Sequence, residues 1–160
     1  MRFEPAMSHE HWMQFALREA EKAAGRGEVP VGAVVVGHDQ LIGRGHNLVE
    51  TLQDATAHAE MIAITAAAGS SGSWRLDGAT LYVTLEPCPM CSGAVLLSRI
   101  SNVVYAARDP RFGACGSVTN VLEKNPFGPP VEIVSGILEN QCQQLLQSFF
   151  QKLRQTNIQK

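Results

Sequence analysis

Two strand-like segments separated by one short helix-like segment constrain the fold of this chain most strongly. Residues 80–84 and 102–107 are rich in β-branched and aromatic side chains, whereas residues 89–97 follow a turn and suit a helix. A strand, a crossover helix and a second strand within so few residues favour parallel pairing of the strands. The segment therefore predicts an α/β layer fold.

The rest of the chain continues this alternation. Ser8 is suited to cap a helix that glycines 25 and 27 end, and residues 31–46 form a predicted β-hairpin with its turn at residues 37–39. Thr56 is expected to cap a second helix over residues 57–68, which a Gly/Ser-rich loop ends. Residues 131–135 offer a fifth strand, and residues 140–154 a closing amphipathic helix.

Size and composition indicate one domain and exclude several classes of protein. The 160 residues contain no internal repeat or long linker, so a single domain over residues 1–160 is expected, with its core at about residues 8–154. There is no secretory leader or apolar run of membrane-spanning length, so no membrane association is expected. Four cysteines in such a chain indicate a reducing cytoplasm, where thiols serve metals, catalysis or packing.

The candidate chemistry is carried by His58, Glu60, Cys88 and Cys91. A CxxC turn at a helix start brings two sulfurs within reach of one ion, and the helix N-terminus favours the thiolate that a metal requires. With the histidine these thiols form an N, S, S ligand set suited to zinc, and the fourth tetrahedral position is left for water. An open position indicates catalysis rather than a structural metal.

Glu60 has the position of a proton carrier rather than a ligand. It follows His58 by two residues, and residues at that spacing do not share a face of a regular helix. A carboxylate beside the metal site can take a proton from a water whose pKa zinc lowers to about 7, and return it to a substrate nitrogen. The four residues therefore predict zinc-assisted hydrolysis.

These motifs resemble the zinc-dependent nucleobase deaminase superfamily. The resemblance rests on His58-Ala-Glu60 followed by Pro87-Cys88-Pro-Met-Cys91. Further stretches are similar to the bacterial tRNA-specific adenosine deaminases, and together they extend the resemblance over about residues 8–154: residues 28–33, 56–60, 81–94, 107–109, 113–117 and the paired phenylalanines 149 and 150.

The resemblance implies a three-layer α/β/α fold with a mixed five-stranded sheet and an N-terminal β-hairpin, a homodimer, and conversion of the wobble adenosine of a tRNA anticodon to inosine. It implies one Zn²⁺ per subunit held by His58, Cys88 and Cys91, with Glu60 as the proton carrier. The residues that it places near substrate are Asn47, Val29, Asp109 and Phe149. Asn47 would hydrogen-bond the flipped base, and Val29 would line its pocket.

The resemblance implies a contact of Arg111 with the RNA backbone, and the charge pattern indicates further contacts from Lys152 and Arg154. The overall charge of −2 conceals an asymmetry: residues 1–98 hold six basic and eleven acidic side chains, whereas residues 99–160 hold seven and four. No acidic residue follows Glu139, while Lys152, Arg154 and Lys160 do. The C-terminal third is therefore where RNA is expected.

Alternatives remain open from the sequence. The two motif cysteines alone would also suit a redox pair or a structural zinc site. A deaminase of free bases or nucleosides, such as a guanine or cytosine enzyme, would use the same chemistry, and a noncatalytic zinc-binding RNA module is a third possibility. Several residues also have simple structural interpretations: a strand end for Asn47, a turn start for Asp109, core packing for Phe149, Phe150, Cys115 and Cys142, and a structural hydrogen bond for His46.

Overall fold

The structure, a computed structural model, describes residues 6–158 and contains a five-stranded mixed sheet. Lys160, counted above among the C-terminal basic residues, lies outside the described residues. The strands, in spatial order, are β2 (Gln40–His46), β1 (Gly32–Gly37), β3 (Thr80–Leu85), β4 (Asn102–Ala107) and β5 (Glu132–Ser135). β1 pairs antiparallel with β2 and β3, whereas β3, β4 and β5 are parallel. The predicted hairpin and the predicted parallel pair are confirmed.

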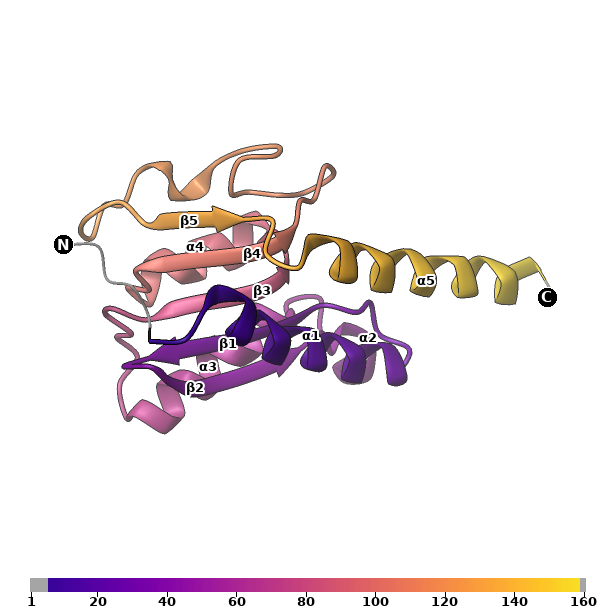
Figure 1. The fold of residues 1–160 in the computed structure, drawn as a ribbon, viewed down its shortest axis with the longest axis horizontal. Helices are drawn as coiled ribbons and strands as arrows, with labels where there is room; N and C mark the ends of the chain where they lie inside the picture. The colour runs from indigo at the N-terminus through magenta and orange to yellow at the C-terminus, as the bar shows by residue number, and fades with distance from the viewer. Residues whose placement is uncertain (1–5, 159–160) are drawn as a thin grey trace.

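Helices cover both faces of the sheet (Figure 1). They are α1 (His9–Gly25), α2 (Val49–Leu52), α3 (Ala59–Ser71), α4 (Pro89–Leu97) and α5 (Glu139–Ile158), with a 3-10 turn at Val121–Glu123. Because strand side chains alternate between faces, Leu81 and Val83 pack toward α3 and α4, whereas Tyr82 packs toward α1 and α5. The three-layer α/β/α fold is therefore confirmed.

Most helix boundaries follow the sequence, but the predicted cap of the second helix is wrong. Ser8 caps α1, where its hydroxyl accepts a hydrogen bond from the His11 N–H at 3.1 Å. The N-cap of α3 is His58, not Thr56. Thr56 instead binds Asp54, whose carboxylate accepts hydrogen bonds from its N–H at 2.8 Å and its hydroxyl at 2.7 Å.

Two helix ends and one short helix also differ from the prediction. α3 continues to Ser71, beyond the predicted end at residue 68, and Gly72 at φ +68° ends it as a left-handed cap. The closing helix, α5, is longer than the predicted residues 140–154 at both ends. The single turn of α2 was not predicted, because four residues carry no periodic pattern.

α5 packs on the sheet only at its start. Of its described residues, Cys142 alone is buried, within the cluster formed by α1 and the sheet. The rest of the helix projects past the edge of the sheet (Figure 1). No helix in the described part of the chain is both long enough and apolar enough to cross a membrane.

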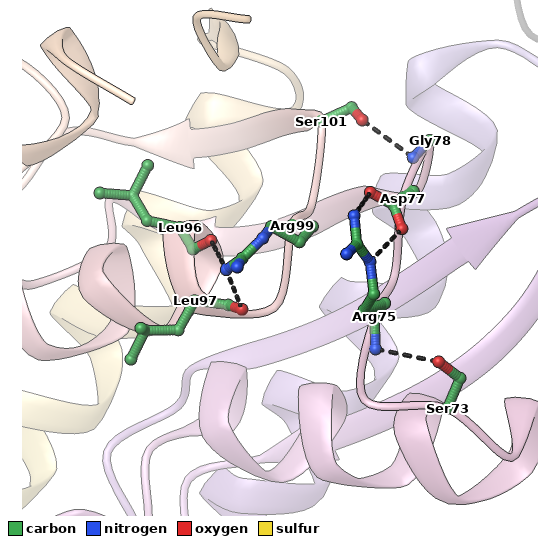
Figure 2. Close-up of polar contacts among 8 residues, drawn as sticks. All are labelled: Ser73, Arg75, Asp77, Gly78, Leu96, Leu97, Arg99 and Ser101. Atoms are coloured by element: carbon green, nitrogen blue, oxygen red, sulfur yellow. Dashed lines mark hydrogen bonds and ion pairs between the residues drawn. The ribbon is translucent and has the colours of Figure 1, made fainter. Parts of the chain in front are cut away.

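Contacts at the amino ends of β3 and β4 fix where these strands begin (Figure 2). The Gly78 N–H donates to the Ser101 hydroxyl at 2.9 Å, which ties the two entry turns together. Arg99, at φ +65°, donates from Nη1 to the Leu97 carbonyl at 2.8 Å and so satisfies the C-terminal end of α4. The start of each strand determines where its carboxyl end lies, and the candidate site is built at that end.

α3 lies unusually close to the β-hairpin because glycines on β2 face alanines on the helix. A Cβ atom added to Gly45 would lie 2.7 Å from the Ala59 carbonyl oxygen and 2.7 Å from the Ala63 nitrogen. Those are backbone atoms of the first turns of α3, which cannot rotate away as a side chain can. The spacing between β2 and α3, and hence the position of His58, depends on this contact.

We predict that Gly45→Ala lowers the free energy of unfolding by about 1–3 kcal/mol, because the added methyl group forces α3 away from β2. The matched control is Gly69→Ala, an exposed position on the same helix where the added atom meets nothing within 4 Å. Chemical denaturation monitored by circular dichroism measures both. Equal stabilities of the two variants would show that the contact does not set the helix position.

Candidate metal centre and active site

Three ligand atoms converge where α3 and α4 begin. His58 is the N-cap of α3 and Cys88 is the N-cap of α4, both with extended backbone conformations, and Cys91 lies in the first turn of α4. Pro89 occupies the first turn of α4, where its missing N–H leaves no hydrogen bond unmade. Both helices start near the carboxyl end of β3, which is where α/β sheets usually bind ligands.

The spacing of these atoms fits a zinc ion. His58 Nδ1 is 3.6 Å from Cys88 Sγ and 3.5 Å from Cys91 Sγ, and the three ligand atoms lie within 4.8 Å of one another. Zn–S and Zn–N bonds of about 2.3 and 2.0–2.1 Å at a tetrahedral angle place nitrogen and sulfur about 3.6 Å apart. Two thiols and one imidazole are also the donor set that zinc prefers. The residues therefore fit zinc, with three protein ligands rather than four.

The pKa values of the two thiols are shifted in opposite directions. The hydrogen bond with Cys91 is the largest effect that lowers the pKa of Cys88, which falls to about 4. The hydrogen bond with Cys88 raises the pKa of His58, and the same thiolate together with burial raises the pKa of Cys91. One thiolate is thus available at neutral pH to attract a cation.

Glu60 lies beside this triad and faces a cavity. It occupies the first turn of α3, is 4% exposed, and lines the cavity with His58 and Cys88. Burial raises the pKa of its carboxyl group. A carboxyl group in this place can hold and release a proton next to a reacting group.

The cavity has a volume of about 310 Å³, which is in the size range of small-ligand sites. Its apolar walls include Val31 and Leu85, and its acidic groups are Glu28, Glu50, Glu60, Glu86 and Asp109. None of its described lining residues is Lys or Arg. The cavity is therefore suited to a neutral, partly apolar group rather than to a phosphate.

One wall is held together by Asn47 and Glu28. Asn47 Nδ2 donates to the Val29 carbonyl at 3.3 Å, and Asn47 Oδ1 accepts from the Val49 N–H at 3.2 Å. The buried Glu28 carboxylate accepts from the N–H groups of Glu50 at 3.0 Å and Thr51 at 2.8 Å, in the first turn of α2. Asn47 and Val29, the residues expected to bind the base and line its pocket, both line the cavity, and Asn47 directly follows the last residue of β2.

The opposite wall is organised by Glu86. Its buried carboxylate accepts hydrogen bonds from the N–H groups of Asp109 at 3.2 Å, Cys115 at 3.0 Å and Ser117 at 3.1 Å, and from the Ser117 hydroxyl. Burial alone would raise the pKa of Glu86, but these hydrogen bonds outweigh it and lower the pKa. The loop that carries Asp109 and Phe112 to the cavity is thereby fixed.

Of the residues predicted to contact the RNA outside the base pocket, only Asp109 lines the cavity. Asp109 lines the cavity and also starts a turn, since its Oδ1 accepts from the Arg111 N–H at 2.9 Å. Arg111 itself is exposed outside the cavity lining. Phe149, Lys152 and Arg154 lie on α5, and none of the three lines the cavity.

The structural interpretations of His46, Cys115 and Cys142 are confirmed, whereas core packing is wrong for Phe150, which is 39% exposed. His46 Nδ1 binds the Glu19 carboxylate at 3.1 Å, and Cys115 and Cys142 are buried. The sequence motifs predict no role for Glu28, Glu86 or Phe112. Glu28 and Glu86 act through backbone N–H groups distant in sequence, which no local spacing reveals, and only the adjacency of Glu86 to Pro87-Cys88 offered a signal.

Comparison with known proteins agrees with this site. The MafB19-like deaminase family matches residues 7–154. The chain therefore belongs to this family of deaminases. Within it, the chain groups with the tRNA-specific adenosine deaminases, since it is 52% identical to that of Bacillus subtilis (strain 168) over 145 residues, 91% of this chain and 90% of that protein.

Solved structures show the same relationship. A structure from studies of A-to-I editing by tRNA:A34 deaminases at the wobble position of transfer RNA is 41% identical, with a TM-score of 0.80 over 85% of this chain and 99% of that chain. Guanine deaminase from Nitrosomonas europaea is 25% identical, with a TM-score of 0.78 over 91% and 86%. The fold is thus shared by enzymes with different purine substrates.

Removing one thiol of the triad tests the metal centre. We predict that Cys91→Ala purifies with far less than the roughly one zinc per chain of the parent, because two protein ligands do not hold the ion. Cys142→Ala removes an equally buried thiol on α5 and should keep the metal. Elemental analysis after dialysis against a mild chelator measures both. Full zinc in Cys91→Ala would rule out this triad.

Glu28 gives a prediction for pH dependence. Burial would raise the pKa of Glu28, but hydrogen bonds from Thr51 and Glu50 lower it below the usual value. Its stabilisation is therefore complete above the unfolded pKa of about 4.3 and is lost as pH falls through the lower folded pKa. Glu28→Gln should cost about 1.5–3 kcal/mol of unfolding free energy at pH 7 and progressively less below pH 4 or so.

The matched control for Glu28 is Glu50→Gln, which removes the same charge from an exposed side chain and leaves the backbone donor in place. Urea denaturation at several pH values measures both variants. A deficit for Glu28→Gln that stays constant across pH would show that the ionised carboxylate is not what holds α2.

Proposed function

We propose that this chain catalyses the hydrolytic deamination of adenosine to inosine at the wobble position of a tRNA anticodon. The single observation that carries the proposal is the buried Glu60 carboxyl group, which shares a cavity wall with the three-ligand His58, Cys88 and Cys91 centre. A site that only binds RNA has no use for a carboxyl group in that place. The group's position therefore favours an enzyme over a noncatalytic zinc-binding module.

The residues divide the reaction between them. When bound, zinc at His58, Cys88 and Cys91 lowers the pKa of water to about 7 and so supplies a nucleophile at neutral pH. Glu60 takes the proton released as the water oxygen adds to C6 of adenine and delivers it to N1 of the ring. Glu60 then takes the remaining proton from the added hydroxyl group and gives it to the amino group as the C6–N6 bond breaks, which leaves the C6 carbonyl of inosine. Water and adenosine thus give inosine and ammonia.

The cavity favours a flipped base over a phosphate. Its lining is apolar and acidic, so the neutral adenine ring can enter while the RNA backbone stays outside. Asn47 uses one amide N–H and one oxygen lone pair for its hydrogen bonds to Val29 and Val49. Its second N–H and second lone pair remain for hydrogen bonds to the base. We propose that Asn47 binds the base edge and that Val29 packs against the ring.

RNA substrates are favoured over free purines by the sequence relationship rather than by the fold. A guanine deaminase shares the fold at 25% identity, whereas a tRNA-specific adenosine deaminase is 52% identical over most of both chains. Outside the cavity, Arg111, Phe149, Lys152 and Arg154 are the proposed contacts with the anticodon arm. Lys152 and Arg154 are exposed on α5, where no acidic residue follows Glu139.

A homodimer working in the cytoplasm completes the proposal. Two exposed aromatic side chains, Trp74 and Phe127, lie near the C-terminal end of α4. The Arg99 guanidinium lies between them, 3.8 Å from the Phe127 ring centre and 5.4 Å from that of Trp74. Leu97, on the same end of α4, is 63% exposed. A second copy of the chain would cover such a surface.

Glu60→Gln tests the catalytic assignment. The amide is nearly the same size but cannot take a proton, so we expect about one zinc per chain and a kcat at least about 100-fold lower. Glu21→Gln, an exposed position on α1, is the control and should retain activity. Turnover is measured on an anticodon stem-loop with wobble adenosine, in parallel with free adenine, guanine, cytosine and their nucleosides. Near-normal turnover by Glu60→Gln, or wild-type turnover of free bases alone, would contradict the proposal.

A further inference from the structure

Phe112 is the residue of the cavity that the proposed chemistry leaves unexplained. It lines the cavity, yet it is 57% exposed, and of the lining residues only Glu50 is also exposed. The other apolar residues of the lining, such as Val31 and Leu85, are at least partly buried. Phe112 therefore stands at the mouth of the cavity with an aromatic face in solvent.

The backbone beneath Phe112 is held in place. Its N–H donates to Asp109 Oδ1 at 3.3 Å, and the next N–H, of Gly113, donates to the Asp109 carbonyl at 3.0 Å. Gly113 packs directly on the Glu86 carboxylate, so that a Cβ atom there would overlap it. An exposed ring on a fixed support loses little conformational freedom when a ligand covers it.

The position of the ring identifies what would cover it. A base that enters the cavity from a nucleic acid strand brings its neighbour to the mouth. Phe112 offers a flat apolar face and no side-chain hydrogen-bonding group, and aromatic rings stack on any nucleobase through their π faces. The acidic lining beside it would repel a phosphate but not an uncharged base.

We propose that Phe112 stacks on the nucleobase adjacent to the adenosine that is deaminated and so positions the RNA strand at the mouth of the cavity. This role rests on the proposed function, because it requires a polynucleotide substrate. It makes Phe112 a substrate-positioning residue that sets a preference for an intact neighbouring base without reading its identity.

The test compares stem-loops in which either neighbour of the wobble adenosine is intact or abasic. On intact RNA, Phe112→Ala should lower kcat/KM about tenfold, which corresponds to about 1.4 kcal/mol and lies within the usual range of base stacking on an aromatic ring. On one of the two abasic RNAs, the wild type and Phe112→Ala should react at equal rates. Phe112→Trp should keep the wild-type pattern on every RNA.

Val118→Ala is the matched control, since Val118 is equally exposed at 57%, lies in the same loop region and does not line the cavity. It should react like the wild type. A second readout is independent of turnover: 2-aminopurine at the neighbouring position should be quenched on binding to Glu60→Gln and less so on binding to the variant that also carries Phe112→Ala.

The outcomes separate this inference from the proposed function. If the wild type forms inosine in intact RNA but Phe112→Ala loses nothing, or loses the same factor on intact and on both abasic RNAs, the stacking role is overturned and the deaminase function stands. If the wild type forms no inosine in any of the RNAs, the proposed function fails and the stacking role fails with it.

Discussion

The N-termini of α3 and α4 meet at the carboxyl edge of the sheet, and the rest of the site depends on that meeting. α4 is placed there by the parallel β3–α4–β4 unit, while α3 is placed by its close contact with the hairpin. Gly45 permits the contact because any side chain there would collide with the helix backbone. The fold thus brings the His58 imidazole close to the thiols of Cys88 and Cys91, which lie 30 and 33 residues later in the sequence, so that all three can bind one ion.

Three of the buried carboxyl groups hold the structure together, and one lines the cavity beside the metal ligands. Glu28 and Glu86 are saturated by hydrogen bonds from the loops on either side of the cavity, and Glu19 is held by Lys22 and His46. The fourth buried carboxyl group, Glu60, lies beside the metal ligands and lines the cavity. The loops that shape the pocket are therefore fixed by the same type of side chain that we propose as the proton carrier.

Some of this arrangement could be predicted from the sequence because it is local. The two cysteines of one turn and the His-x-Glu spacing define their own geometry, and strand periodicity defines the two faces of the sheet. The residues that escaped prediction depend on contacts between distant loops: Glu28 caps a helix that begins 21 residues later, at Val49, and Phe112 reaches the cavity because Glu86 holds its loop. Thr56 failed as a cap because Asp54, two residues earlier, competes for it.

The C-terminal helix shows a different limit of prediction from the sequence. Its basic residues and Phe149 follow the pattern expected of an RNA-binding element, yet α5 runs past the sheet and places them outside the cavity. Their proposed contacts lie along the RNA, away from the reacting base. In the proposed function, substrate recognition is divided between a cavity for one base, Phe112 at the mouth of the cavity and the basic residues of α5.

The central claim is that three protein ligands hold one zinc ion and leave a position open beside Glu60. X-ray absorption at the zinc edge of the purified protein tests it most directly. The account predicts two sulfur neighbours at about 2.3 Å and two lighter neighbours at about 2.0–2.1 Å, only one of which shows the outer-shell scattering of an imidazole. A third sulfur, or a second imidazole in place of the exchangeable light atom, would contradict the claim, because a closed site has no room for the reacting water.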